Sequence, residues 1–162
     1  MGQPMIKDDT VDTKTLFRHA LGQFATGVTI VTCQGPNGPM AITANSFNSV
    51  SLDPALVLWS SSKTSKRYPA FVNAQHYAIH VLSAEQIDLC NRFSKSADNF
   101  DDLSWSYSPN GVPLLDGCLA RFECSLSAHH DGGDHTIIVG AVDAFETNDG
   151  EPLIFAQGGF LT

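Results

Sequence analysis

The stretch VTIVTCQGPNGPMAITANS, residues 28–46, has two apolar segments on either side of a cluster of glycine, proline and asparagine. The first segment, 28–33, is rich in β-branched residues, which are typical of strands. The central QGPNGP consists of residues that favour tight turns. Because the chain can reverse there and return as a second strand over 40–46, the stretch predicts an antiparallel hairpin.

Helical patterns occur at three places around this hairpin. Apolar residues recur at helical spacing over residues 13–25, which predicts an amphipathic helix. A brief helix is expected up to residue 72, and a capping box at Ser83 and Gln86 begins another that ends near residue 93. Further strands are predicted at 55–60, 76–82, 119–128, 136–144 and 153–155, whereas 94–118 is predicted to be irregular.

This order of elements contains six or more short strands and no regular alternation of strand and helix. It favours a closed or nearly closed antiparallel barrel over a doubly wound parallel sheet. A chain of 162 residues is most economically one domain. We therefore predict a mainly β domain over residues 13–162, a six-stranded antiparallel barrel with the 13–25 helix packed on its outside. Residues 1–12 are expected to form a flexible N-terminal arm.

Composition and charge exclude several classes of protein. The net charge of −8 argues against nucleic-acid binding, which requires clustered Lys and Arg. No window approaches the ~18 apolar residues of a membrane span, and the N-terminus lacks the apolar core of a signal peptide. A cytoplasmic location is expected. The four cysteines are scattered without a C-x-x-C pair, which predicts buried or idle thiols rather than a zinc or redox site.

Two polar stretches are candidates for ligand binding. ITANSFNSVSLDP, residues 42–54, offers many donors to a ligand rich in oxygens, although a Ser- and Asn-rich turn accounts for it as well. SSSKTSKRY, residues 60–68, contains three of the nine basic residues. With its hydroxyls and a predicted helix N-terminus it suits a phosphate, although a solvated basic turn is the alternative. No Rossmann or P-loop motif is present.

The stretch HHDGGDH, residues 129–135, allows four interpretations: a metal site, a catalytic base, a sharp turn or a cofactor contact. Metal ligation requires converging side chains. In a hairpin, His129 and His135 flank a glycine turn and need not converge, so no metal is expected and a turn is favoured. No Ser-His-Asp spacing or nucleophile elbow indicates a hydrolase. The residues alone predict a β-rich domain with a phosphate-bearing ligand.

Five stretches, in this order, resemble the short-chain flavin reductases, the NAD(P)H:flavin oxidoreductases that supply two-component monooxygenases. They are FRHALGQFATGVTIVT, AITANSFNSVSLDPALVLWS, YAIHVL, GDHTIIVGAV and PLIFAQGGF, and they cover the chain from Phe17 almost to its end. Ala55 departs from the pattern, since family members often carry a second proline there, and residues 94–118 match only loosely. The resemblance implies a flavin-binding split barrel and a homodimer with flavin near the subunit interface.

The resemblance also assigns site residues. The flavin ring and ribityl chain would be lined by Thr43, Ala44, Asn45, Ser46, Phe47, Ser49, Val50 and Ser51. The phosphate would meet Ser60, Ser62, Lys63 and Lys66 or Arg67, and an FAD adenylate would run along Arg92, Phe93 and Ser94. His135, preceded by Gly133 and Asp134, corresponds to the histidine associated with the nicotinamide, and Phe160 would help to close that side.

The activity implied by this resemblance is hydride transfer from NADH, or NADPH, to FMN or FAD. Both cofactors bring their own redox chemistry, so the protein mainly has to stack one ring on the other. Reduced flavin would then reach a partner monooxygenase. Two alternatives remain open: a reductase with tightly bound flavin that reduces a cobalt corrinoid or ferric chelate, and a flavin- or heme-binding module without turnover.

Overall fold

The hairpin predicted at residues 28–46 forms the first strand pair of the molecule. In the computed structural model, which describes residues 12–161, β2 (Thr29–Gly35) pairs with β3 (Gly38–Ala44). Gly38 has a φ of 137° in the turn, a value that favours glycine. The turn cluster therefore sets the register that places Thr29 opposite Ala44.

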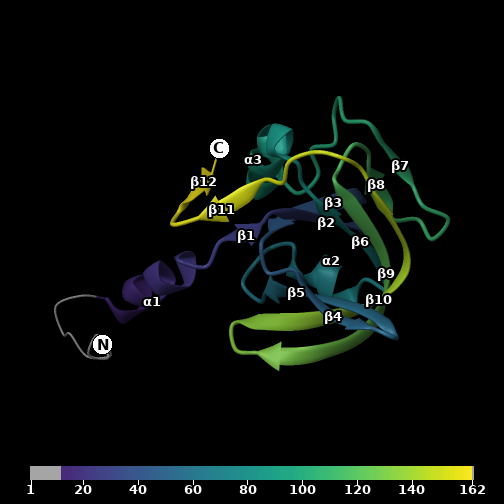
Figure 1. Cartoon of the computed structure of the whole chain (residues 1–162). Helices are drawn as coiled ribbons and strands as arrows, with labels where there is room; N and C mark the ends of the chain where they lie inside the picture. Colours follow the sequence, from purple (N-terminus) through teal and green to yellow (C-terminus); the bar gives the residue numbers. More distant parts are fainter. Residues whose placement is uncertain (1–11, 162) are drawn as a thin grey trace.

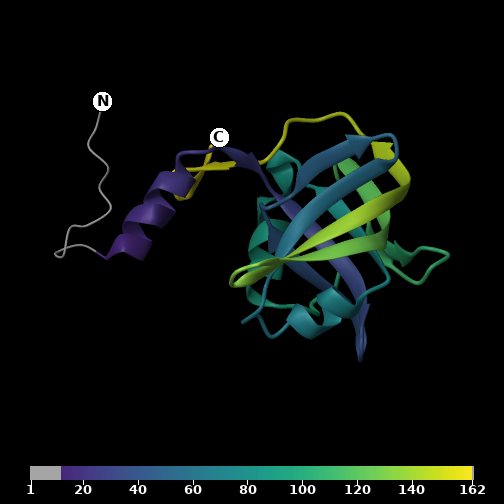
Figure 2. The same cartoon turned by 90° about the horizontal axis from the view of Figure 1, so that it is seen from below.

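Seven antiparallel strands make up the main sheet and curl into a barrel (Figures 1 and 2). Their order is β3-β2-β6-β9-β10-β5-β4, so the two edge strands are consecutive in the chain and the barrel stays open between them. The prediction of a mainly β, antiparallel split barrel with a few helices is confirmed, with seven strands in place of six. The five further strands are β4 (Asn48–Leu52), β5 (Ala55–Ser62), β6 (His76–Val81), β9 (Ala120–Gly132) and β10 (His135–Thr147).

Short elements cover the barrel. The predicted brief helices are α2 (Tyr68–Asn73) and α3 (Ile87–Lys95), the latter preceded by the 3-10 turn η1 (Ala84–Gln86) with the predicted capping box. A small sheet combines β1 (Thr26–Gly27), β11 (Ile154–Ala156) and β12 (Gly159–Leu161). The prediction that 94–118 is irregular is wrong in part, because β7 (Trp105–Tyr107) and β8 (Pro113–Leu115) pair within it.

Large side chains fill the barrel from both walls. Trp59 packs edge-on against Phe71, with ring centroids 5.4 Å apart, and lies 6.5 Å from the ring of Tyr77. Gly140 is required opposite them, since a Cβ there would lie 2.1 Å from the Tyr77 hydroxyl. A second buried cluster, which includes Phe93, lies under α3.

His80 forms hydrogen bonds to the backbone of two residues of this second cluster. It is fully buried; its Nδ1 lies 3.0 Å from the Ile30 carbonyl oxygen, and its Nε2 lies 3.0 Å from the Leu115 amide nitrogen. Because Nε2 accepts the amide hydrogen, Nδ1 carries the proton and donates to Ile30. Burial lowers the pKa of His80 to about 4, so the ring is neutral at pH 7.

The first helix differs from its prediction. α1 (Thr13–Gly22) is shorter than residues 13–25, buries none of its side chains and projects away from the barrel (Figures 1 and 2). The expectation that it packs on the barrel is wrong, because only its C-terminal end is fastened: the Gly22 carbonyl accepts the Gln157 amide at 2.7 Å. Of the predicted arm, residues 1–11 lie outside the described residues, and Asp12 caps α1. Within residues 12–161 no helix has the length and apolarity to cross a membrane.

Candidate functional site

Three adjoining hollows lie beside the open edge of the barrel, and Thr43 of β3 lines all three. We call them together the Thr43 trough. Their volumes are about 190, 230 and 430 Å³, and together they reach the size of cofactor pockets. The trough therefore brings together segments that are far apart in the sequence: the end of β3, the end of β5, α3, the start of α2, β11–β12 and the β9–β10 hairpin.

The end of β3 and its link to β4 form the polar wall of the trough. Ala44, Asn45 and Ser46 line it, and the Thr43 hydroxyl donates to the Cys90 carbonyl at 2.8 Å. The Ser46 hydroxyl accepts from the Ser60 amide at 2.9 Å and donates to the Ser60 carbonyl at 3.2 Å. These bonds hold the link against β5, so its backbone and the exposed Asn45 present a fixed row of polar groups.

Cations gather at the α2 end of the trough. Ser65, Lys66 and Arg67 line the same hollow as Phe93 and Ser94. The Arg67 guanidinium is half-buried and donates to the carbonyls of Ala41 and Phe93. Burial lowers the pKa of Arg67 below its ordinary value; with an ordinary pKa above 12, an arginine stays charged at neutral pH. This end suits an anionic group of a ligand.

Lys63, the third predicted phosphate cation, does not line the hollow that contains Lys66 and Arg67. Its ammonium pairs with Asp131 on the β9–β10 hairpin, and its backbone amide donates to the Asp134 carbonyl at 2.9 Å. The hydrogen bond to Asp131 is the main cause that raises the pKa of Lys63. The structure thus brings together two of the three predicted phosphate cations, Lys66 and Arg67, and places the third as a clamp on the hairpin.

The β9–β10 hairpin carries His135 to the opposite end of the trough. Gly133 has a φ of 77° in the turn, and His135 begins β10 opposite Ser62. His135 lines one hollow with Ser60 and Ser62, as the resemblance implied. Its Nδ1 lies 2.7 Å from an Asp134 carboxylate oxygen, a hydrogen bond that lowers the pKa of Asp134. A proton on Nδ1 leaves Nε2 as the acceptor.

The other histidines of this stretch take no part in the trough. His129 and His130 lie on β9 opposite Ile138 and Ile137, and both are exposed. In the described part of the chain, no three His, Cys, Asp or Glu side chains are grouped so that they could hold a metal ion.

Several predicted residues lie outside the trough. Phe47 stacks on Phe122, with centroids 5.5 Å apart, and packs against the barrel core. The three residues predicted from β4 line none of the hollows that form the trough: Ser49, Val50 and Ser51. The sequence predicted no strand between residues 46 and 55. Instead, residues 48–52 pair with β5 as an edge strand.

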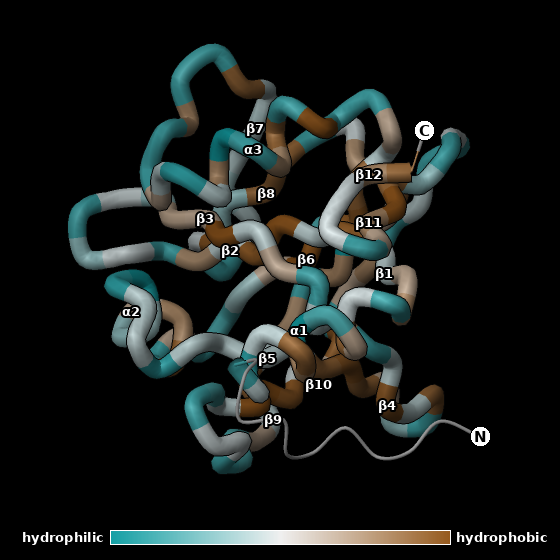
Figure 3. The backbone as a smooth tube through the Cα atoms, turned by 90° about the vertical axis from the view of Figure 1, so that its left-hand side faces the viewer, coloured by the Kyte–Doolittle hydropathy of each residue, from teal (hydrophilic) through white to brown (hydrophobic). Residues whose placement is uncertain are grey.

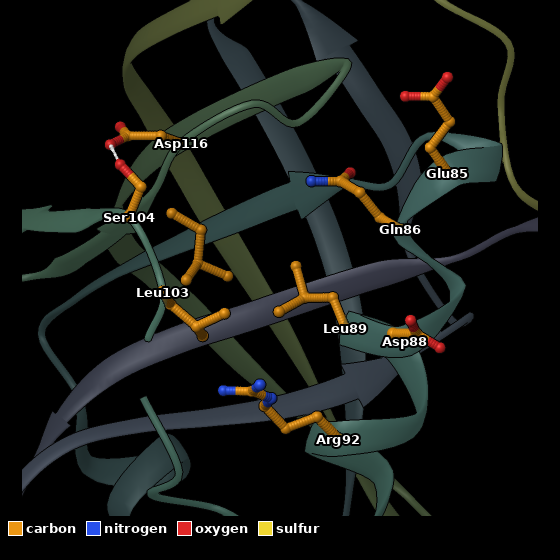
Figure 4. A pocket seen from close by; sticks show the side chains of 9 residues that line it. Glu85, Gln86, Asp88, Leu89, Arg92, Leu103, Ser104 and Asp116 are labelled. Atoms are coloured by element: carbon orange, nitrogen blue, oxygen red, sulfur yellow. Dashed lines mark hydrogen bonds between the residues drawn. The ribbon is translucent and has the colours of Figure 1, made fainter. Parts of the chain in front are cut away.

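Arg92 lies on the far side of α3 from the trough. Its guanidinium donates to the Asp101 carbonyl at 2.6 Å, and it lines a separate pocket with the carboxylates of Glu85, Asp88 and Asp116 (Figure 4). Its neighbours Phe93 and Ser94 do line the trough. Of the three residues predicted to follow an adenylate, Phe93 and Ser94 therefore line the trough and Arg92 does not.

Some trough residues were missed by the sequence prediction. Cys90 and Asn91 reach it from α3, Phe155 joins the predicted Phe160 on the β11–β12 side, and Trp59 contributes from β5. The ring centroids of Phe155 and Phe160 lie 5.5 Å apart, and the two rings pack edge to face. Periodicity predicts which side of α3 is apolar. No local pattern predicts that α3 lies beside β3, where the Thr43 hydroxyl bonds to the Cys90 carbonyl.

Together these groups suit a long planar ligand with an anionic end. Backbone and hydroxyl groups lie along one wall, aromatic rings along another, cations at the α2 end and a histidine at the hairpin end. Among the described residues that line the three hollows there is no carboxylate, and the hydrogen bond of the His135 imidazole is to Asp134 rather than to a serine or cysteine. Its side chains can bind and orient a redox cofactor, and the redox chemistry itself must come from that cofactor.

Comparison with known proteins agrees with this geometry. The flavin reductase like domain family matches residues 21–162. The FMN reductase (NADH) SmoA of Agrobacterium fabrum is 58% identical over 89% of this chain and 83% of its own. The reductase subunit HsaB of a flavin-dependent monooxygenase from Rhodococcus jostii is 39% identical over 97% of this chain and 81% of its own.

A solved structure is similar over the same length. The NADH:FAD oxidoreductase SgcE6 of Streptomyces globisporus, in complex with NAD and FAD fragments, superimposes with a TM-score of 0.87 at 37% identity, covering 94% of each chain. The family and the enzyme class predicted from the sequence are therefore confirmed. This chain belongs to the flavin reductase-like domain family of oxidoreductases.

Proposed function

We propose that this protein binds a flavin along the Thr43 trough and a reduced nicotinamide at the His135 end, as an NAD(P)H:flavin oxidoreductase. A bound flavin would supply the redox chemistry, as the acceptor of the hydride of the nicotinamide, and the protein would hold the two rings together. The residues present fit that group: amides and hydroxyls at 43–46 for ring and ribityl oxygens, and Lys66 with Arg67 for the phosphate.

The phosphate end supports binding. Arg67 is fixed by the carbonyls of Ala41 and Phe93, so its charge is already in place before a ligand arrives. Lys66 is exposed and adds a second cation. Charge-assisted hydrogen bonds of this kind are each worth roughly 1.5–3 kcal/mol when well formed. Both FMN and FAD carry a phosphate at the end of the ribityl chain.

The hairpin end supports turnover. With Asp134 holding its Nδ1 proton, His135 presents Nε2 as an acceptor for the carboxamide amide of the nicotinamide. This contact orients the ring without moving a proton. The Lys63 clamp holds the hairpin against the end of β5. Asp134 and Gly133 then shape the turn and need no direct contact with the cofactor.

The observation that carries the proposal is the meeting of Asn45 and Ser46, Ser60 and Ser62, and His135 in one hollow. These residues come from three segments that are far apart in the sequence. The first would lie along the flavin ring, the second belongs to β5, and the third would contact the nicotinamide. SmoA is named an NADH-dependent FMN reductase, and NADH is accordingly the expected donor. HsaB is a monooxygenase reductase subunit, so we expect reduced flavin to be delivered to a partner monooxygenase.

A homodimer is part of the proposal, since the resemblance to the short-chain flavin reductases implies a homodimer with flavin near the subunit interface. A cytoplasmic location is proposed as well, in keeping with four buried free thiols. The phosphate and hairpin ends described above do not depend on either of these two points.

NADH oxidation with and without free flavin tests the activity. A reductase that uses flavin as a substrate accelerates as FMN or FAD is added. Turnover that needs a cobalt corrinoid or ferric chelate, and ignores free flavin, would favour the prosthetic-group alternative. Flavin binding without any NADH oxidation would favour a carrier and would overturn the proposal.

A further inference from the structure

A hydrogen bond outside the Thr43 trough joins the elements that carry its two ends. The Tyr68 hydroxyl, on the first residue of α2, lies 2.7 Å from the Thr136 hydroxyl, on the second residue of β10. Thr136 is 6% exposed, and Tyr68 is half-buried. In the part of the chain that the structure describes, no other hydrogen bond joins α2 to β10. We call this bond the Tyr68–Thr136 tie.

Each residue of the tie directly follows a residue of the proposed site. Arg67, at the α2 end of the trough, precedes Tyr68, and His135, at the hairpin end, precedes Thr136. Because consecutive Cα atoms are only about 3.8 Å apart, a bond between the second members of these pairs restricts the distance between the first. The tie therefore limits how far the cation and the histidine can move relative to each other.

Residues 62–68, which connect β5 to α2, are held to the hairpin and β10 at both ends. Near the start of this segment, the Lys63 amide donates to the Asp134 carbonyl at 2.9 Å. At its end lies the Tyr68–Thr136 tie. Both cations of the α2 end lie between these two bonds, on a turn in which the Ser65 carbonyl accepts the Tyr68 amide at 3.1 Å. The two bonds thus enclose the part of the chain that would meet a phosphate.

Apolar packing holds the body of α2 but does not orient its first turn. Phe71 is 1% exposed and packs edge-on against Trp59 of β5, with ring centroids 5.4 Å apart. Such packing is non-directional, whereas a hydrogen bond fixes the distance and direction of two groups. In Figure 3 the chain is hydrophilic where it enters α2 and hydrophobic along β10. Since α2 has six residues and no side-chain cap at its N-terminus, we expect the tie to orient its first turn.

The wall along the flavin ring is attached to His135 by a separate route. The Ser46 hydroxyl accepts from the Ser60 amide at 2.9 Å, and β5 pairs with β10 in a register that places Ser62 opposite His135. This route passes through β5 and does not include α2. The tie is therefore not needed to hold the histidine beside the ring wall. It acts on the separation between the histidine and the cations.

From this geometry we infer that the Tyr68–Thr136 tie positions His135 relative to the cations of the α2 end. Tyr68 and Thr136 line none of the three hollows, so they are positioning residues. Their role rests on the proposed function, in which a phosphate is held at Arg67 and a nicotinamide at His135. A phosphorylated flavin is anchored at the α2 end, so its ring meets the nicotinamide correctly only if the two ends are correctly spaced. Riboflavin has no such anchor, and its ring is placed by the wall alone.

Removal of either hydroxyl tests this role. Tyr68→Phe and Thr136→Val each delete one partner of the bond and preserve the shape of the side chain. With saturating flavin and NADH, rapid mixing should show FMN reduction about tenfold slower than in the parent, because misplaced reacting groups lose rate. Riboflavin reduction should stay close to the parental rate. Tyr107→Phe and Thr147→Val, at exposed positions of β7 and of the far end of β10, are matched controls and should behave as the parent with both flavins.

The double variant shows whether the two hydroxyls act through their bond. Contributions of groups in direct contact are not additive, so the protein with both Tyr68→Phe and Thr136→Val should reduce FMN no more slowly than either single variant. Losses that multiply would mean that the hydroxyls act separately, which overturns the inference. The FMN dissociation constant should stay close to the parental value in all three variants, since Arg67 keeps its bonds to Ala41 and Phe93.

The comparison of the two flavins separates positioning from a general loss of structure. Equal losses with FMN and riboflavin, or no loss with FMN, would overturn the inference. If the parent reduces neither flavin, the proposed function fails, and hydrogen exchange still decides whether the bond holds the segment. Amides of residues 62–68 and of the start of β10 should lose protection in Tyr68→Phe, whereas those of α3 should not. Unchanged protection would overturn the tie. Should Tyr68→Phe fail to fold by circular dichroism, Thr136→Val carries the same test from β10.

Discussion

Two regions on either side of the trough differ in the hydrogen-bond partners of their polar side chains. Under α3, the fully buried His80 and the half-buried Arg67 bond to backbone groups. At the β9–β10 hairpin, Lys63, Asp131 and Asp134 are exposed and bond to other side chains. We therefore expect the buried bonds to stabilise the fold, and the exposed side-chain pairs of the hairpin to contribute little to stability.

Removal of His80 is expected to have the largest effect on stability. His80→Ala leaves the Leu115 amide without its acceptor, removes the side-chain donor to the Ile30 carbonyl and opens a cavity, which together cost about 3–5 kcal/mol. His130→Ala, at an exposed position of β9, should change the free energy of unfolding by less than about 0.5 kcal/mol. Urea denaturation measures both. Equal, small losses would show that the buried region does not fasten the fold.

The pH dependence of stability should have the same origin. The pKa of His80 is lowered from 6.5 to about 4 in the folded chain, so the unfolded chain binds the proton more readily. The stabilisation that comes from the neutral His80 ring should therefore be fully present above pH 6.5. The free energy of unfolding should fall by about 3 kcal/mol as the pH drops from there to 4. In His80→Gln this component of the pH dependence should be missing. A His80→Gln profile parallel to that of the parent would rule out the assignment.

Substitution of Arg67 tests the trough at its buried end. Arg67→Ala should weaken FMN binding about 10–100-fold, the equivalent of roughly 1.5–3 kcal/mol. Riboflavin, which lacks the phosphate, should lose far less. Lys63→Ala is the control and should bind FMN nearly as well as the parent, since that ammonium is paired with Asp131. Fluorescence titration measures these affinities, and equal losses for FMN and riboflavin would count against a phosphate contact.

Disruption of the hairpin clamp should have the smallest effect. Asp131→Asn removes the charge that pairs with Lys63, while the Lys63 amide still holds the Asp134 carbonyl. We expect a KM for NADH a few-fold higher, unchanged FMN affinity and an unchanged unfolding midpoint in urea. A clear loss of stability would show that the two regions do not differ as described.

The predictions that held rest on local signals. The turn cluster at residues 34–39 and the glycines at 132–133 fixed two hairpins, and with them the position of His135 at the start of β10. The capping box at Ser83 is likewise a signal within four residues. In each case the chain needs only its neighbours to specify the conformation.

The predictions that failed depend on contacts between distant residues. β4 has the composition of a turn and becomes a strand because β5 pairs with it, with a bulge between Ser49 and Ser51. α1 has the periodicity of a helix packed on its own domain, and only the structure shows that its apolar side chains are exposed.

Hydride transfer in His135→Ala tests the central claim most directly, namely that the hairpin end serves turnover and the α2 end serves binding. Rapid mixing of NADH with the flavin-loaded protein should give a rate of flavin reduction about 100-fold below that of the parent, since misplaced reactants lose rates of this order. The FMN dissociation constant should stay within a factor of two or three, and His130→Ala should match the parent in both. Flavin reduction at the parental rate in His135→Ala, or a large loss of FMN binding, would contradict this division of the trough.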